Sequence, residues 1–321
     1  YAKSVIDNLG CKGFYYDLSF TDLEEHLESV IFSMEDITDY FGNVWHLYKM
    51  MKQNGISVSL DGHGGDELLG GYHHHPLVML KDWFRVHPER PSIRKLLEVH
   101  ESITGVPVTS NMIKSRLGTR PRESIVGNHP LLTHSPQPFH YQRYSQDQTK
   151  LNDKESFFKS LYFEFHHGSL PTILRNFDRL SMANGVEIRS PFLDWRLVCF
   201  SFSLPSWSKI DDQGTKQILR QAMRGLMPEL VRTRKKKLGF VSPFNNWLQQ
   251  GLHKKISNIV NDHSFQQTSL FDGKKTQLIF ASALKEKDWS RIHQLWPFIQ
   301  AYFLDLVFKK KRAEHMKAHH N

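Results

Sequence analysis

The hydrophobic and polar positions of the first sixty residues follow helical and extended periods in turn. Residues 1–10 place apolar side chains at helical spacing and end in Gly10, a residue type that commonly ends helices. Residues 13–20, with the sequence GFYYDLSF, have the aromatic content that favours a strand. The pattern therefore predicts a helix followed by a strand.

Two further helices and a second strand are predicted next. Residues 21–37 begin with Thr21, a helix-capping residue type, and residues 43–55 form another amphipathic pattern that ends in Gly55. The short apolar run at 56–60, ISVSL, is typical of a buried strand. Helices that alternate with strands in this order predict an α/β protein with a parallel sheet.

The rest of the pattern is mostly helical. Residues 76–126 show helical periodicity interrupted by prolines. Residues 127–150 are polar and rich in Pro, His and Gln, which favours a long surface connection. Residues 151–321 return to helical patterns, and we find no internal repeat. We therefore expect a helix-rich α/β protein.

Composition narrows the class of protein. The chain has 321 residues, of which 39% are hydrophobic, so it can bury a sizeable core. No apolar run approaches the roughly 20 residues of a membrane-spanning helix, and the first ten residues are not a signal peptide. Cys11 and Cys199 lie far apart without C-x-x-C spacing, which argues against a disulfide framework or a zinc site. We expect a cytoplasmic protein.

The net charge of +9 is spread widely along the chain, and its densest runs are at 232–237 and 308–320. Such runs are usually solvated, and the chain has no recognisable nucleic-acid-binding module, so we expect neither a nucleic acid nor a membrane as its partner. His73, His74 and His75 could suggest a metal site. Consecutive side chains point in different directions, however, which favours a solvent-facing loop.

Candidate chemistry begins in residues 56–72, ISVSLDGHGGDELLGGY. Open α/β sheets bind ligands at the carboxyl ends of their strands, and glycines let backbone N–H groups approach an anion. Acidic residues repel phosphate directly, but they hold Mg²⁺, which prefers carboxylate and phosphate oxygens together. The stretch fits a metal-nucleotide loop, and a glycine-rich turn beside helix-capping residues would explain it equally well.

Two further segments carry charges in unusual contexts. Residues 173–198 intersperse apolar positions with the charged residues Arg175, Asp178, Arg179, Glu187, Arg189 and Asp194. Such charges need partners or a ligand, because unpaired buried charge is costly. Residues 232–248 set a cationic run against a Gly-Phe turn, which suits placing a lysine in a pocket. An ion-pair network and a solvated basic face are the structural alternatives.

Together these segments resemble the synthetase domain of the glutamine-hydrolysing asparagine synthetase family, which includes β-lactam synthetase. The pattern S/D-G-x-G-x-D-E-x-x-G-G-Y resembles residues 61–72, and D-R-x-S-M-A-x-G-V-E-x-R-x-P-F-L-D matches residues 178–194. T-K-x-I-L-R-x-A-M matches residues 215–223, and R-K-K-x-L-G-F-x-x-P ends in Pro243. The segment LWPFIQAYF at 295–303 resembles the final helix of the family.

The resemblance implies a PP-loop ATPase-like synthetase domain over residues 1–321. Residues 1–75 would be part of the nucleotide-binding α/β unit, residues 76–150 a helical part with the polar connection, and residues 151–321 a helical part that completes the active site. The implied reaction uses ATP to convert the side-chain carboxylate of aspartate to β-aspartyl-AMP and pyrophosphate. Ammonia, normally from glutamine, then displaces AMP to give asparagine.

The resemblance also implies roles for single residues. Asp66 matches the aspartate that helps to hold Mg²⁺ on the pyrophosphate. Lys237 matches the lysine that stabilises the charge developing on the α-phosphate and the leaving pyrophosphate, a role that a desolvated ammonium can fill. Four more charged residues are candidates for structural or substrate-pocket roles: Glu67, Arg179, Glu187 and Arg189.

The loop before Asp66 departs from the family pattern at His63 and at Asp61, which stands where many relatives have serine, although an aspartate version also occurs in the family. Asp61 and Gly62 match the pair that lines the ATP site, and Gly64 belongs to the same ATP-binding loop. His63 occupies the position tied to acyl-adenylate formation, which is commonly acidic in asparagine synthetases and tyrosine in β-lactam synthetase. Imidazole can act as a base towards ammonia but supplies no fixed negative charge. Another carboxylate acceptor, in surface-glycan or natural-product assembly, and a non-catalytic relative both stay open.

Two parts of the family pattern do not occur in the 321 residues. These are the phosphate-binding S-G-G-x-D-S loop and the N-terminal glutaminase domain with its leading cysteine. Because the chain opens with Tyr1 inside a helical pattern, we expect a part of a longer protein whose glutaminase domain lies upstream. We expect this part alone to be inactive, and a homodimer is compatible with the pattern.

Overall fold

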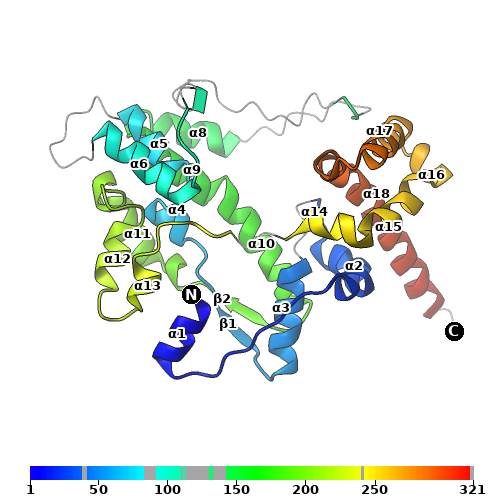
Figure 1. Ribbon diagram of the computed structural model, residues 1–321, viewed down its shortest axis with the longest axis horizontal. Coiled ribbons are helices and arrows are strands. Elements are labelled where there is room, and N and C mark those ends of the chain that lie inside the picture. Colours follow the sequence, from blue (N-terminus) through cyan, green and yellow to red (C-terminus); the bar gives the residue numbers. More distant parts are fainter. Residues whose placement is uncertain are drawn as a thin grey trace.

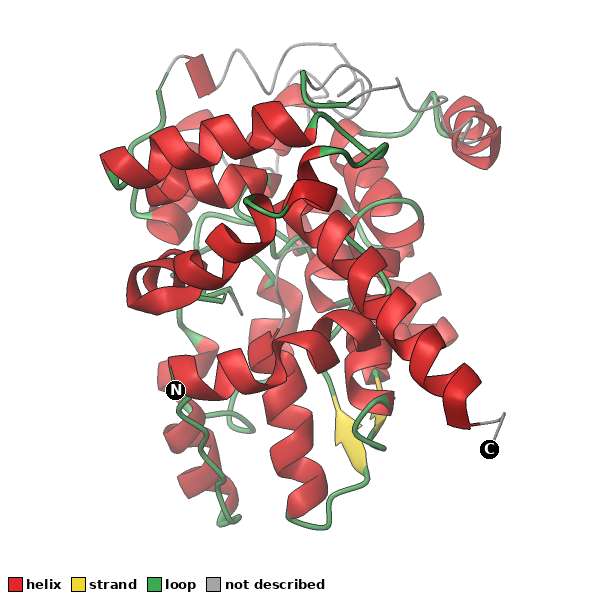
Figure 2. Cartoon of the chain, turned by 90° about the vertical axis from the view of Figure 1, so that its right-hand side faces the viewer, coloured by secondary structure: helices red, strands yellow, loops and turns green. Residues whose placement is uncertain are grey.

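The computed structural model describes residues 1–37, 42–82, 92–109, 111–112, 130–132, 142–239 and 242–318. Helices make up most of these residues, and a small sheet lies near one edge of the molecule (Figure 1, Figure 2). The sheet has two parallel strands, β1 (Val58–Leu60) and β2 (Glu187–Arg189), with Val58 opposite Glu187 and Leu60 opposite Arg189. The expected helix-rich α/β protein with a parallel sheet is confirmed.

The N-terminal segment contains a predicted helix and lacks a predicted strand. Helix α1 (Ala2–Leu9) ends as expected at Gly10, which has a φ of +62°. Residues 13–20 do not form a strand: they run without regular structure into α2 (Phe20–Met34). Ser19, not Thr21, caps α2, because its side chain accepts from the backbone of Asp22 while the Asp22 carboxylate accepts from Ser19.

The second predicted strand forms, but it is not buried. Helix α3 (Gly42–Gln53) ends shortly before Gly55, whose φ of +76° turns the chain towards β1. Val58 is 40% exposed and Leu60 is 74% exposed. Within the described residues β1 pairs only with β2, so neither of these side chains is covered as it would be in the middle of a wide sheet.

The larger hydrophobic core lies among α2, α3, α10 (Ser169–Met182) and the C-terminal helices. Leu23, Leu27 and Ile31 share one face of α2, because their spacing is helical, and each is at most 2% exposed. They belong to the same core as Trp296. The C-terminal helices are α14 (Phe244–Trp247), a π-type turn (Leu248–Leu252), α15 (His253–Val260), α16 (His263–Gln266), α17 (Gly273–Glu286) and α18 (Trp289–Ala318).

A smaller hydrophobic core lies among three other helices. Leu77, Leu96 and Phe157 are buried there, and α10 packs both against α9 and against the helices of the larger core. Figure 1 accordingly shows two groups of helices joined through α10. The three helices of the smaller core are α5 (His75–Met79), α6 (Ile93–Thr104) and α9 (Ser156–His166).

Short helices complete the described part of the chain. They are α4 (Gly65–Leu69), α8 (Gln142–Lys150), α11 (Trp195–Ser203), α12 (Gln217–Ala222), α13 (Glu229–Arg232) and 3₁₀ turns at Leu80–Asp82, Pro191–Leu193 and Ser206–Ser208. The end of the expected surface connection is thus helical, whereas residues 127–129 and 133–141 of it lie outside the described residues. No described helix combines the length and apolar character needed to cross a bilayer.

Candidate functional site

The loop between β1 and α4 presents the acidic residues of the glycine-rich stretch. The backbone N–H of Asp61 donates to the carbonyl of Arg189 over 2.9 Å, which fixes the loop at the carboxyl end of the sheet. Gly64 has a φ of +89°, and a Cβ at this position would lie 2.5 Å from a leucine side-chain carbon. Only glycine suits this position. The turn then places Asp66 at the start of α4.

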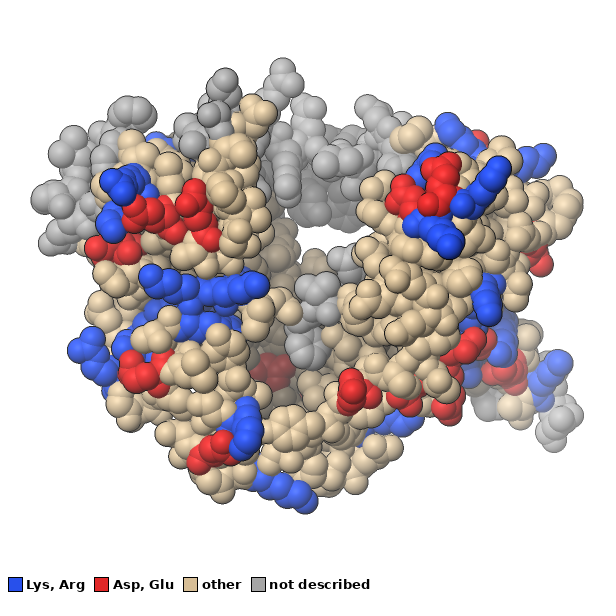
Figure 3. Space-filling model, in the orientation of Figure 1, with Lys and Arg blue, Asp and Glu red and all other residues tan. Residues whose placement is uncertain are grey.

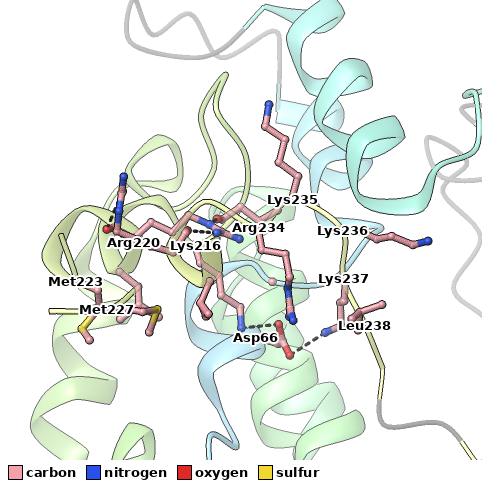
Figure 4. Close-up of a pocket in the computed structure, with 15 residues that line it drawn as sticks. Asp66, Lys216, Arg220, Met223, Met227, Arg234, Lys235, Lys236, Lys237 and Leu238 are labelled. Atoms are coloured by element: carbon pink, nitrogen blue, oxygen red, sulfur yellow. Dashed lines mark hydrogen bonds and ion pairs between the residues drawn. The ribbon is translucent and has the colours of Figure 1, made fainter. Parts of the chain in front are cut away.

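Two lysines from distant parts of the chain converge on Asp66. Lys216 Nζ lies 2.8 Å from Oδ1 of Asp66, and Lys237 Nζ lies 2.8 Å from Oδ2 (Figure 4). Burial opposes the charge on Asp66, but the two ammonium groups outweigh it and hold the pKa of this carboxyl below its usual range. The carboxylate of Asp66 is therefore ionised at neutral pH.

The backbone around this ion-paired trio is specialised. Lys216 has a φ of +57°, a left-handed conformation that is uncommon for a lysine and is often found at functional sites. At Gly71 a Cβ would lie 1.8 Å from Asp66 Oδ1 and 2.2 Å from Lys216 Cε. Gly71 therefore has to be a glycine for the lysine and the carboxylate to meet.

A cationic cavity of about 250 Å³ opens beside the trio. Figure 3 shows Lys and Arg side chains gathered on this face near α12 and α13. In Figure 4, Lys236 points away from Asp66. A polyanion would satisfy this concentration of positive charge. The charged residues that line the cavity are Asp66, Lys216, Arg220, Arg232, Arg234, Lys235, Lys236 and Lys237.

His63 lies apart from this cavity. It lines a second cavity of about 440 Å³, together with Arg175, Asp178 and Ser190. Its ring packs edge-on against Phe177, with centroids 4.5 Å apart. His63 Nδ1 is buried without a hydrogen bond from the described residues, and burial lowers the pKa of the imidazole. A neutral imidazole with an unused ring nitrogen can accept a proton.

The side chain of Asp61 is held by hydrogen bonds and lies close to His63. Its carboxylate accepts hydrogen bonds from Ser59 Oγ and from Tyr48 OH, the latter over 2.9 Å. His63 Nδ1 is 3.8 Å from Asp61 Oδ2. Gly62, the other predicted member of this pair, would have open space around a Cβ. Both residues lie at the carboxyl end of β1, where ligands of open α/β sheets bind.

The remaining predicted residues line neither of these two cavities. Glu67 is 2% exposed and accepts from Tyr72 OH over 2.5 Å. Arg179 donates to the carbonyl of Met34 over 2.5 Å. Glu187 and Arg189 pair with each other over 3.0 Å on β2, and both side chains are more than half exposed. The charged segment at 173–198 thus contains ion pairs, but several of them lie near the surface.

Of the three histidines expected in a solvent-facing loop, His73 is exposed in a turn, whereas His74 and His75 are not exposed. His75 is fully buried, and Glu164 of α9 accepts a hydrogen bond from His74 Nε2 over 2.6 Å and from His75 Nε2 over 2.8 Å. The prediction of an exposed loop is wrong for His74 and His75, because the carboxylate of Glu164 is hydrogen-bonded to both rings. Pro76 is the sequence signal that could have indicated a helix instead of a loop here, because proline favours the start of a helix.

The His74, His75 and Glu164 cluster has the side-chain types of a metal site, with its ligand atoms within 4.8 Å of one another. The backbone N–H of Tyr72, however, donates to His75 Nδ1 over 3.2 Å. The proton of neutral His75 therefore sits on Nε2, where a metal would have to bind. We conclude that the three residues form a hydrogen-bonded cluster and not a preformed metal site.

Comparison with known proteins agrees with the pattern of motifs. The family model for asparagine synthase matches residues 1–307. Asparagine synthetase (glutamine-hydrolyzing) 1 of Bacillus subtilis (strain 168) is 28% identical over 264 residues, which cover 74% of this chain and 41% of that protein. A putative asparagine synthetase (glutamine-hydrolyzing) of Mycobacterium tuberculosis (strain ATCC 25618 / H37Rv) is 30% identical over 215 residues, 61% of this chain and 31% of that protein.

A protein with a different name is also similar. Amidase chry2 of Gibberella zeae is 29% identical over 148 residues, which cover 44% of this chain and 22% of that protein. The chain therefore spans less than half the length of each of these relatives.

Proposed function

The chain belongs to the asparagine synthase family, and we propose that it is the synthetase part of an ATP-dependent amide ligase that makes asparagine. In the proposed reaction the side-chain carboxylate of aspartate attacks the α-phosphorus of ATP. The bond to pyrophosphate breaks, and β-aspartyl-AMP forms. Ammonia derived from glutamine then attacks the acyl carbon and loses a proton, the bond to AMP breaks, and asparagine and AMP leave.

The observation that carries this proposal is the pairing of Asp66 with Lys216 and Lys237 beside a cationic cavity. A triphosphate would bring oxygens that compete with Asp66 for the two ammonium groups. Lys237, once turned towards the phosphates, would stabilise the negative charge that develops as pyrophosphate leaves. Asp66 thus positions the two lysines, and a more highly charged anion can replace it as their partner.

The same carboxylate fits a magnesium ion. Asp66 offers two oxygens, the ligand type that Mg²⁺ prefers, and lies next to cations suited to phosphate. Mg²⁺, when bound, would neutralise charge on the phosphate oxygens. We propose Asp66 as its protein ligand, with Asp61, Gly62 and Gly64 forming the ATP-binding loop in front of it. Glutamine would supply ammonia through a glutaminase domain of the complete protein, working in the cytoplasm.

His63 is proposed as the base for the second step. Its pKa is lowered by burial, so the imidazole is neutral at pH 7 and Nδ1 can take the proton that ammonia loses. The two cavities would then divide the reaction, with phosphates beside Lys237 and the acyl group towards His63.

A second acceptor is the alternative that a specific observation favours. His63 stands at a position that is commonly acidic in asparagine synthetases, and one similar protein carries the name amidase. An amidotransferase of the same fold could therefore act on another carboxylate. The ATP-binding half of the site would be the same in both cases, so only the acid specificity separates them.

Acid-dependent exchange of labelled pyrophosphate into ATP tests the proposal in the full-length protein. We expect exchange with aspartate and Mg²⁺, and much less with glutamate, succinate or glycine. Exchange with another carboxylic acid but not with aspartate would favour the second acceptor. Absence of exchange with every acid, in protein that is folded, would contradict an adenylating ligase.

A further inference from the structure

The ring of Tyr72 forms a second contact of the Lys237 ammonium. Lys237 Nζ lies 4.2 Å from the centroid of this ring while it also donates to Asp66 over 2.8 Å. An ammonium at this distance from an aromatic face is attracted by the electron density of the ring. Lys216 shares the carboxylate of Asp66, yet among the described residues it has no aromatic ring at this distance.

Tyr72 itself is held from its hydroxyl end. Its OH donates to Oε1 of Glu67 over 2.5 Å, and it lies 3.4 Å from Ser169 Oγ. Ser169 also donates to Glu67 over 3.3 Å. Because Glu67 is 2% exposed and belongs to α4, the ring is anchored to the same helix that carries Asp66.

The ring and the backbone of Tyr72 also contact two histidines, His74 and His75. The Tyr72 ring stacks on His74, with centroids 5.7 Å apart and planes 10° apart. The Tyr72 backbone donates to His75, and both histidines donate to Glu164. The position of Tyr72 is therefore fixed by contacts of its hydroxyl, its ring face and its backbone, none of which involves Lys237.

We propose that Tyr72 is a positioning residue for Lys237: its ring holds the ammonium at the edge of the cationic cavity, and Glu164 braces the ring through His74 and His75. The consequence for catalysis rests on the proposed function of Lys237. The contact itself does not, and it can be measured without turnover. Without the ring, Lys237 would be held only by its ion pair with Asp66, as Lys216 is.

Competitive acetylation of lysines, read by mass spectrometry, measures the contact in the 321-residue chain. Wild type is compared with Tyr72→Met, which keeps an apolar side chain but removes the ring, and with Tyr72→Phe, which keeps the ring. Lys216 is the matched control because it shares Asp66. Lys209, which is 1% exposed, reports whether each variant is folded.

We expect acetylation of Lys237 to rise several-fold in Tyr72→Met while that of Lys216 and Lys209 is unchanged. Tyr72→Phe should leave Lys237 as protected as in wild type. Equal protection of Lys237 in Tyr72→Met and wild type would overturn the proposal. So would a rise in Tyr72→Phe as large as in Tyr72→Met, since that result would assign the effect to the hydroxyl.

A second variant leaves Tyr72 untouched. In Asp66→Asn both lysines lose the charge of their shared partner, but only Lys237 keeps a ring. Lys237 should then stay more protected than Lys216, whereas equal acetylation of the two lysines would contradict the ring contact. This comparison holds even where Tyr72→Met does not fold.

Turnover of the full-length protein separates this inference from the proposed function. If wild type forms AMP, Tyr72→Met should lower kcat with little change in the KM for Mg-ATP, because a misplaced Lys237 fails in the transition state. An unchanged kcat would refute the positioning role. If wild type is folded but forms no AMP, the proposed function fails, and the acetylation pattern still decides whether the ring holds Lys237.

Discussion

At the scale of single residues, the site depends on Asp66 and the two lysines that reach it from distant segments. Lys216 precedes α12, and Lys237 lies in the stretch that follows α13. Each is 2.8 Å from a different oxygen of the same carboxylate, and Gly71 leaves the space in which they meet. In this trio the carboxylate of Asp66 holds two ammonium groups in place, and such positive groups are suited to a phosphate.

Replacement of Lys237 by alanine tests its assigned role. We expect the rate of AMP formation by the full-length protein to fall by about 10²–10³-fold, the usual cost of losing one preorganised group that stabilises transition-state charge. Single-turnover measurement of AMP isolates this step. Lys310→Ala is the control, because Lys310 lies on α18, pairs with Glu28 and does not line the cationic cavity. Unchanged turnover in Lys237→Ala would refute the role of this lysine.

The sequence motifs selected Asp66 and Lys237, because each sits in a segment with family-specific spacing, and the structure places the two side chains 2.8 Å apart. They did not indicate that Lys216 shares the carboxylate. Nor did they indicate that Tyr72 faces Lys237, because a contact across 165 residues depends on how α4 and the segment after α13 pack. Glu187 and Arg189 were candidates as charged positions of the matched signature at 178–194, and they form an exposed pair.

At the scale of elements, local signals predicted helices better than strands. Gly10 and Gly55 mark real turns with positive φ, and α1, α2 and α3 lie close to the predicted ranges. The aromatic run at 13–20 is no strand, because a strand requires a neighbouring strand and none of the described strands pairs with this segment. Its Tyr15 is 68% exposed instead.

The histidine cluster at the start of α5 makes a prediction about acid stability. Burial disfavours the charge on Glu164, but hydrogen bonds from His74 and His75 outweigh it and lower its pKa to about 2, against an ordinary 4.5. A depressed carboxyl pKa stabilises the fold by about 3 kcal/mol above pH 4.5, and this contribution is lost as the pH falls towards 2.

Urea unfolding at several pH values measures this contribution. Glu164→Gln should lower the free energy of unfolding at pH 7, and its difference from wild type should shrink as the pH falls from 4.5 towards 2. Glu98→Gln, at an exposed ion pair of α6, is the control and should change stability little. A difference between Glu164→Gln and wild type that does not depend on pH would contradict the assigned pKa.

At the scale of the whole molecule, two groups of packed helices are joined through α10, and the β1–α4 loop lies between them and the sheet (Figure 1). The resemblance to a known family predicted this helix-rich α/β architecture, since its motifs run along most of the chain. The apolar run at 56–60 taken alone predicts a buried strand, whereas Val58 and Leu60 of β1 are exposed, because among the described residues β1 pairs only with β2.

Nucleotide binding by the 321-residue chain is expected to be weak. Its cationic cavity contains lysines and arginines, but the chain contains no S-G-G-x-D-S loop to surround the phosphates with backbone N–H groups. Exposed Val58 and Leu60 should also promote self-association at high concentration. Calorimetry with Mg-ATP and light scattering measure the two effects. Tight, saturable binding to a monodisperse chain would contradict both expectations.

We propose that a carboxylate oxygen of aspartate attacks ATP, and this claim can be tested by following that oxygen into AMP. The full-length protein would be given Mg-ATP, ammonium and aspartate labelled with heavy oxygen in its side-chain carboxylate, and AMP would be analysed by mass spectrometry. Adenylation predicts AMP that carries one heavy oxygen, formed in equal amount with asparagine. Unlabelled AMP, or label found in inorganic phosphate, would contradict the claim.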